Sequence, residues 1–67
     1  MIKVKVGRLL KERGKNATDL MREARIAYTT ALRLSKGEGN GMSFEVLDRL
    51  CAYFNVQVKD IIEYVPD

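Results

Sequence analysis

The side chains best suited to contact another molecule lie between residues 28 and 36, where the apolar residues recur with helical spacing. On the outward face of this predicted helix, four side chains suit the edges of base pairs: Tyr28, Thr29, Leu32 and Arg33. An arginine offers paired donors to guanine, a threonine hydroxyl bonds a base or a phosphate, and a leucine contacts the methyl group of thymine. The pattern predicts a helix that reads the major groove of double-stranded DNA, with Ala27, Ala31 and Leu34 facing inward.

A second set of residues has the chemistry of phosphate contacts, which position a protein on DNA without reading its sequence. Hydroxyls, lysines and the backbone amides of helix starts make such contacts, and these groups occur at three places. They are the start of a helix predicted at 17–24, the glycine-rich loop after residue 36, and the start of a helix predicted at 44–54. The predicted phosphate contacts are Asn16, Ala17, Thr18, Lys36, Asn40, Gly41 and Ser43.

Several of these residues also have a purely structural interpretation. Arg33 could be a solvated or phosphate-bound charge, and Tyr28 could only cover the neighbouring helix. Ser43 suits the cap of the following helix, and the glycines of the loop could simply permit a turn. The prediction of a DNA-reading face therefore depends on the residues of helix 28–36 as a set.

Charge is distributed unevenly along the chain, although the total is only +3. Residues 1–36 contain ten lysines and arginines against three acids, a net charge of +7, whereas residues 37–67 have a net charge of −4. None of the acids falls between residues 24 and 37. A basic surface attracts a polyanion because neutralised phosphates release condensed counterions. A solvated basic surface without a partner is the alternative.

The composition argues against an enzyme and against a membrane protein. The 67 residues include no histidine, a single cysteine, and no glycine loop followed by Lys and Ser or Thr. We therefore expect no catalytic site, no metal and no cofactor. Apolar runs stay far below the ~20 residues that span a bilayer, and no signal peptide is recognisable. We expect one soluble cytoplasmic domain, prokaryotic or phage-encoded and associated with the nucleoid when bound, in which Cys51 is a buried thiol.

Local signals predict the elements that position these residues. The predicted helices cover residues 6–13, 17–24, 28–36, 44–54 and 58–62. Asn16 and Asp19 suit a capping box, Ser43 suits a cap, and Gly14 and Asn55 suit the left-handed residue that ends a helix. The stripe that helix 44–54 turns to the core is predicted to be Phe44, Leu47, Leu50, Cys51 and Phe54. Alternation at 2–6 and an extended stretch at 63–65 predict a short pairing of the two termini, within the chain or across a dimer.

The segment from Asn16 to Lys36 and the following glycine-rich loop resemble the phage repressor and Cro type of helix-turn-helix regulators, the xenobiotic-response-element family. The resemblance covers nearly the whole chain, and its tail resembles a short stand-alone subgroup. It implies an all-α, five-helix lambda-repressor-like domain that binds a DNA operator as a homodimer, with the third helix reading bases. It also implies transcriptional control, with repression as the expected outcome.

Five positions depart from the pattern of that family. Arg25 stands where glycine usually makes the turn between the second and third helices, and a non-glycine residue in a left-handed conformation costs about 1 kcal/mol or more. Ala27 replaces the usual hydroxyl cap, and Ala17 replaces a frequent polar phosphate contact. Met21 and Ala31 suggest an exchange of volume across the contact between the two helices.

Two other functions remain open on the same scaffold. One is a protein-binding helper such as an antitoxin or antirepressor, because a fold does not determine a function. The other is RNA binding, for which Tyr28 could stack a base, although no further aromatic platform accompanies it. The apolar residues late in the chain exceed what a small core needs, which is the reason to expect a homodimer. No small-molecule ligand is expected.

Overall fold

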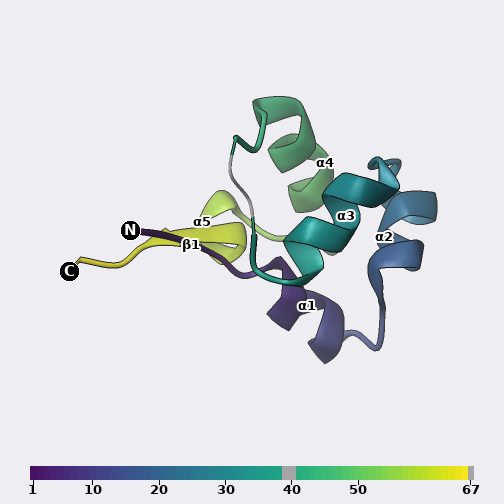
Figure 1. Ribbon diagram of the computed structural model, residues 1–67, viewed down its shortest axis with the longest axis horizontal. Coiled ribbons are helices and arrows are strands. Elements are labelled where there is room, and N and C mark those ends of the chain that lie inside the picture. Colours follow the sequence, from purple (N-terminus) through teal and green to yellow (C-terminus); the bar gives the residue numbers. More distant parts are fainter. Residues whose placement is uncertain (39–40, 67) are drawn as a thin grey trace.

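The computed structural model describes residues 1–38 and 41–66 (Figure 1). In this part of the chain, strand β1 (Ile2–Val4) precedes five helices and strand β2 (Ile62–Tyr64) follows them. The helices are α1 (Val6–Glu12), α2 (Ala17–Ala24), α3 (Tyr28–Ser35), α4 (Phe44–Phe54) and α5 (Val58–Ile61). This order confirms the predicted fold class, a five-helix domain with a short pairing of the terminal strands.

The starts of α2 and α4 follow from the capping residues that the sequence indicates. The amide of Asp19 donates to Oδ1 of Asn16 at 3.0 Å, and the amide of Asn16 donates to Oδ2 of Asp19 at 3.1 Å. At α4 the hydroxyl oxygen of Ser43 accepts from the amide of Val46 at 3.1 Å. These bonds satisfy amides that have no partner within the helix, so both helices begin at the predicted residues.

Three helices end one residue earlier than predicted. Arg13 and Lys36 have ψ angles of 5° and 4°, outside the helical range, so α1 ends at Glu12 and α3 at Ser35. Ile62 is extended with ψ 156° and belongs to β2, which shortens α5 to Val58–Ile61. Strand β1 is shorter than the alternation at 2–6 suggests, because Val6 is the first residue of α1.

The core lies where α1 to α5 meet. Its buried residues are Val6, Leu10, Leu20, Ala24, Ile26, Ala31, Leu34, Leu50, Phe54 and Ile61. Six of them lie on α2, α3 and α4. The guanidinium of Arg13 lies over the ring of the buried Phe54, 5.4 Å from its centroid.

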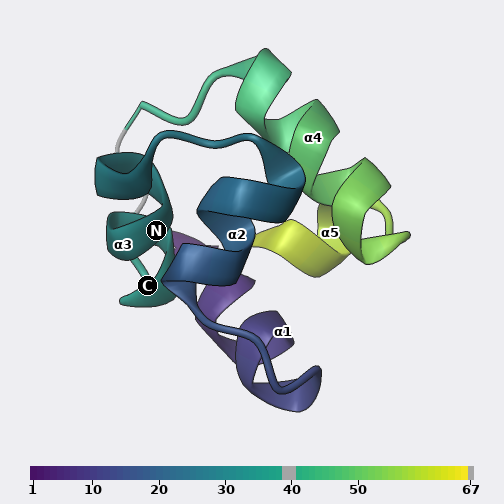
Figure 2. The same cartoon turned by 90° about the vertical axis from the view of Figure 1, so that its right-hand side faces the viewer.

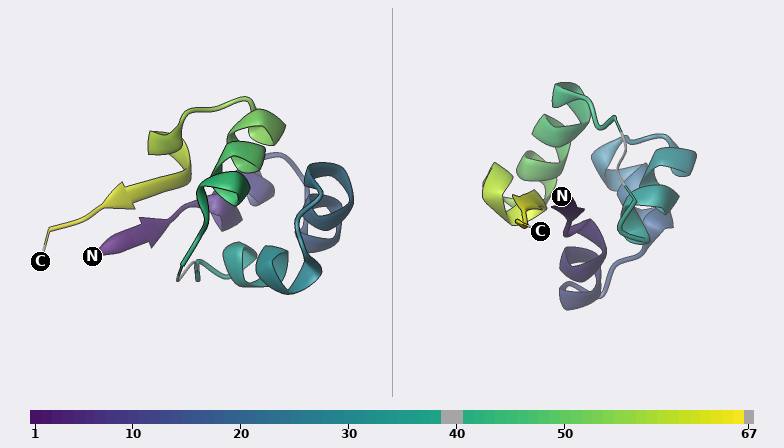
Figure 3. Two further views of the ribbon diagram at one scale, coloured as in Figure 1. Left: turned by 90° about the horizontal axis from the view of Figure 1, so that it is seen from above. Right: turned by 60° about the vertical axis from the view of Figure 1, so that its left-hand side comes forward.

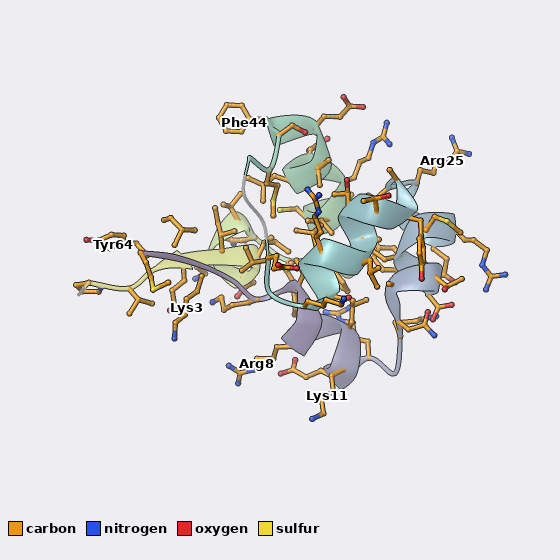
Figure 4. The ribbon with its side chains drawn as sticks, viewed as in Figure 1. Lys3, Arg8, Lys11, Arg25, Phe44 and Tyr64 are labelled. Atoms are coloured by element: carbon orange, nitrogen blue, oxygen red, sulfur yellow. The ribbon has the colours of Figure 1, made fainter. Side chains whose placement is uncertain are left out.

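Two predicted core positions are wrong, and two others are only partly right. Phe44 is 89% exposed, because it is the first residue of α4 and projects outward, where none of the described helices covers it (Figure 4). Ala27 is exposed as well, because it precedes α3 with an extended ψ of 138° and so does not share the inward helical face. Leu47 and Cys51 are half-buried rather than buried.

Helices α2 and α3 form a closely packed pair, seen side by side in Figure 2. Residues 25–27 connect the two helices. The backbone of Arg25 is in the left-handed conformation, with φ 58° and ψ 46°. The sequence predicts this conformation for a residue at the glycine position of the turn. Ile26 is only 3% exposed and anchors the turn in the core.

The two ends of the described chain meet in an antiparallel ribbon that projects from the helices (Figures 1 and 3). The register pairs Ile2 with Tyr64 and Val4 with Ile62. The amide of Lys5 then donates to the carbonyl of Ile61 at 2.7 Å, which joins the base of the ribbon to α5. The pairing lies within one chain, and β2 begins one residue earlier than predicted.

Candidate nucleic-acid interface

Helix α3 presents the predicted base-contacting face to the outside. Tyr28 is 47% exposed, and Thr29 and Arg33 are exposed along the same helix. Leu32 is half-buried, whereas helical spacing predicts that it is exposed. A methyl contact from Leu32 therefore has less surface available than predicted. The other three side chains have the exposure that contact with a base or a phosphate requires.

The start of α2 has two distinct kinds of backbone amide. The capping box engages the amides of Asn16 and Asp19. The amides of Ala17 and Thr18 belong to the first turn, where an α-helix supplies no internal acceptor. Ala17 packs its methyl group partly against the core, so its contribution to a phosphate contact would come from the backbone. Thr18 is exposed and adds a hydroxyl.

A hollow of about 330 Å³ connects α3 to the start of α4. It brings together three of the predicted residues, Arg33, Gly41 and Ser43. Lys36 is exposed at the end of α3, and Asn40 lies outside the described residues. The hydroxyl of Ser43 already accepts a bond from the amide of Val46, so only its proton is left for a phosphate oxygen.

Two polar residues that the sequence does not predict as DNA contacts also line this hollow, Thr30 and Glu38. Thr30 is half-buried on the side of α3 that faces α4. Glu38 is exposed and places a carboxylate beside the same space as Arg33. The only signal for Glu38 in the sequence is its position, since it is the first acid after the acid-free segment 24–37.

The basic residues do not gather on α3. Lys3, Arg8 and Lys11 lie on β1 and α1, and their side chains point away from the body of the domain (Figure 4). Nε of Arg8 lies 3.2 Å from Oε1 of Glu12, which partly offsets its charge. The net charge of +7 in the first 36 residues is thus spread over several surfaces.

Other basic residues also have acidic neighbours. Nζ of Lys15 lies 3.5 Å from Oε1 of Glu23, and Nη2 of Arg22 lies 3.6 Å from Oδ1 of Asp19. Pairs as exposed as these are individually weak. They nevertheless reduce the positive potential around α2, so the support for a phosphate there comes from helix amides and hydroxyls as well as from charge.

The turn between α2 and α3 is hydrogen-bonded to a side chain of α4. Nη1 of Arg49, on α4, donates to the carbonyl oxygen of Arg25 at 2.5 Å. The other terminal nitrogen, Nη2, lies 2.7 Å from Oε1 of Glu45. No sequence pattern indicates this contact, because it joins residues 24 positions apart.

The comparison with protein families decides how this geometry is to be interpreted. The sequence matches the family of Cro/C1-type helix-turn-helix DNA-binding domains over residues 5–67. The chain belongs to this family. The matched range includes α2 and α3, the closely packed pair that Arg25 helps to connect. This family is a class of DNA-binding domains and not a class of enzymes.

A solved structure supports the assignment of this Cro/C1-type domain. The present chain is similar to the transcriptional regulator VanUg with a TM-score of 0.74 and 30% sequence identity, over 98% of this chain and 89% of the VanUg chain. A search of curated proteins found no match. Within residues 1–38 and 41–66, every helix is too short or too polar to pass through a bilayer.

Proposed function

We propose that this Cro/C1-type domain is a sequence-specific regulator of transcription that reads the major groove of an operator with α3. The observation that carries the proposal is the exposure of Tyr28, Thr29 and Arg33 on a helix packed closely against α2. In this motif the second helix lies in the groove while the first crosses the backbone. VanUg, to which the chain is similar, is named a transcriptional regulator.

Base contacts are assigned to Tyr28, Thr29, Leu32 and Arg33. Arg33 is the strongest candidate for sequence discrimination, since a guanidinium can bond O6 and N7 of one guanine together. Phosphate contacts are assigned to two surfaces on either side of α3. One is the start of α2, with Asn16, Ala17 and Thr18. The other consists of Lys36, Gly41, Ser43 and, outside the described residues, Asn40.

The proposed effect on transcription is repression. A protein that occupies an operator overlapping a promoter excludes RNA polymerase sterically, which requires only affinity and specificity for the operator. This mechanism needs nothing beyond the DNA-binding surface. We expect the domain to act in the cytoplasm, on the nucleoid.

The proposed assembly on DNA is a homodimer formed by the surface between α4 and α5. Here a hollow of about 670 Å³ has apolar walls that include Leu47, Cys51 and Val56. Phe44 lines the same hollow and is 89% exposed, so its ring can insert into the hollow of a second copy. A two-fold interface requires a surface that fits itself, and this one holds both a projection and a hollow.

Charge is self-complementary on that surface as well. Asp48 and Lys59 both line the hollow, so two copies related by a two-fold axis can pair Asp48 of each with Lys59 of the other. The two α3 helices would then read half-sites about 34 Å apart, one turn of DNA, or a multiple of that distance.

Selection of bound sequences from a random pool of double-stranded DNA, at two salt concentrations, tests the function. The expected result is an enriched motif made of two related half-sites, with affinity that falls as salt rises. Recovery of no motif at either concentration would contradict sequence-specific reading. Sedimentation of the protein with the selected operator tests the assembly, and a single copy on the full operator would contradict the dimer.

A further inference from the structure

The turn before α3 lacks the local features that usually hold such a turn. Arg25 is left-handed at φ 58°, a conformation that residues with a Cβ adopt reluctantly. The residue in the cap position of α3 is Ala27, whose methyl group cannot accept a hydrogen bond from the free amides of the helix. Neither the conformational preference of residue 25 nor a side-chain cap therefore defines the direction in which α3 starts.

A side chain from α4 contacts a backbone carbonyl oxygen in the turn. Nη1 of Arg49 donates to the carbonyl oxygen of Arg25 at 2.5 Å. This carbonyl belongs to the peptide between Arg25 and Ile26, so its orientation depends on the ψ angle of Arg25. A bond that holds this peptide also holds the path of the chain toward α3. Hydrogen bonds with a charged donor are stronger than neutral ones.

The orientation of the Arg49 guanidinium is itself fixed. Its Nη2 donates to Oε1 of Glu45 at 2.7 Å, one helical turn earlier on α4. A guanidinium is planar and carries its donors in a rigid fork, so one acceptor at each terminal nitrogen determines its plane. Lysine has a single nitrogen at the end of a flexible chain and cannot reproduce this geometry.

We propose that Arg49 is a positioning residue for DNA recognition: it holds the Arg25–Ile26 peptide and thereby sets the direction of α3. The proposal rests on the proposed function, in which α3 reads bases. It assigns to α4 a share in sequence reading without any contact between Arg49 and DNA. It also explains how this chain keeps the motif with arginine at the turn.

The test substitutes Arg49→Lys, which preserves the charge and removes the fork. Arg8→Lys is the matched control, because Arg8 also pairs with a glutamate four residues away, Glu12 on α1, at 3.2 Å. Three quantities are measured for both variants: the melting temperature, the affinity for the selected operator, and hydrogen exchange of the Ala31 amide without DNA. This amide donates to the carbonyl of Ala27 at 2.9 Å and reports on the first turn of α3.

We expect Arg49→Lys to weaken operator binding about tenfold at temperatures where the protein is fully folded. Exchange at Ala31 should accelerate in the same variant, while Arg8→Lys changes neither quantity. Arg25→Gly should remove the dependence on Arg49, because glycine adopts the left-handed conformation without strain. The Arg49→Lys substitution should therefore have little further effect in an Arg25→Gly background.

Three outcomes would overturn the proposal. One is an Arg49→Lys variant that matches Arg8→Lys in affinity and exchange. Another is weaker binding with unchanged exchange at Ala31, which would indicate a direct contact between Arg49 and DNA. The third is a loss of affinity of the same size in the Arg25→Gly background. If the unmodified protein binds no DNA, the proposed function fails, while the exchange data alone still decide whether Arg49 holds the turn.

Discussion

Gly7 on α1 faces the backbone of Ser35 at the end of α3, and a Cβ built on Gly7 would lie 2.5 Å from the carbonyl oxygen of Ser35. Real Cβ atoms do not approach an oxygen so closely. The neighbouring atom belongs to the backbone of a helix, so it cannot swing away as a side chain would. The absence of a side chain at residue 7 therefore allows α1 to pack against the helix proposed to read DNA.

Gly7→Ala should destabilise the domain even though alanine favours a helix by about 1 kcal/mol over glycine. Overpacking of this kind typically costs about 1–3 kcal/mol, and here it acts against a carbonyl that the helix holds in place. Urea unfolding should show a lower free energy of unfolding. Lys11→Ala, at an exposed position of the same helix, should leave it nearly unchanged. A Gly7→Ala variant more stable than the original would contradict the close packing of α1 on α3.

Arg33→Ala and Lys36→Ala should affect DNA binding in different ways. Loss of Arg33 should cost about 1–3 kcal/mol and relax the preference at one base position. Loss of Lys36 should weaken all sequences alike and lower the salt dependence by about one phosphate contact. Binding assays with the selected operator and with single-base variants, each at several salt concentrations, distinguish the two effects. An Arg33→Ala variant with unchanged affinity and preference would rule out base reading by this side chain.

Glu38→Gln should strengthen binding to every DNA sequence. The carboxylate of Glu38 lines the hollow that also contains Arg33 and Ser43, where it repels a phosphate. Glu63→Gln is the control, since Glu63 lies on β2 opposite Lys3 and makes the same change in net charge. Equal gains for both variants would mean that only net charge matters and that Glu38 has no special position.

Tyr53→Phe should remove one component of the loss of stability at high pH. Burial, together with a hydrogen bond from the phenol to Glu23, raises the pKa of Tyr53 from 10.0 to about 12. The folded protein therefore holds the phenolic proton more tightly than the unfolded chain does. This contribution to stability is complete below pH 10 and is lost as the pH rises through about 12.

The measurement is the free energy of unfolding of both proteins between neutral pH and pH 12. Near pH 7 the variant should be less stable by roughly 1 kcal/mol, the usual net contribution of one hydrogen bond. The difference should shrink as Tyr53 ionises. A difference that is constant up to pH 12 would show that Tyr53 does not titrate in this range.

Phe44→Ser should weaken the homodimer without destabilising the monomer. Phe44 is 89% exposed, so its ring contributes little to the core of a single copy. Tyr64→Ser is the matched control, because Tyr64 is also an exposed aromatic residue, at 68%, on the terminal ribbon. Sedimentation should show dissociation only for Phe44→Ser. Dissociation caused by Tyr64→Ser alone would move the interface to the ribbon.

The sequence predicts those features of the fold that depend on neighbouring residues. The cap formed by Asn16 with Asp19, the cap at Ser43 and the left-handed stop at Asn55 all act within a few positions, and each is found where it is expected. The burial of Ala31, Leu50 and Phe54 also follows, because helical spacing defines which residues of a helix share a side. The exposed face of α3 can be predicted from the same spacing, except for the partial burial of Leu32.

The features that are missed depend on how the elements meet. Phe44 continues the apolar stripe of α4 by spacing, but within residues 1–38 and 41–66 no helix covers that end of α4. Glu38 and Thr30 reach the interface only because the start of α4 lies beside α3. The contact of Arg49 with Arg25 requires the packing of α4 on the turn, which no pattern within either segment reveals.

The pairing of β1 with β2 gives the domain a constraint on the order of events during its synthesis. Val6 and Ile61 are both fully buried. Strand β1 precedes Val6, strand β2 follows Ile61, and the ribbon pairs these two strands. When a ribosome has synthesised the chain from α1 to α4, every residue proposed to touch DNA has been made. At that point the core still lacks Ile61, and β2 has not been made. Because Ile61 completes the core, stable folding should require that α5 has been made, so we expect products of translation interrupted before α5 to be degraded rather than to compete for operators.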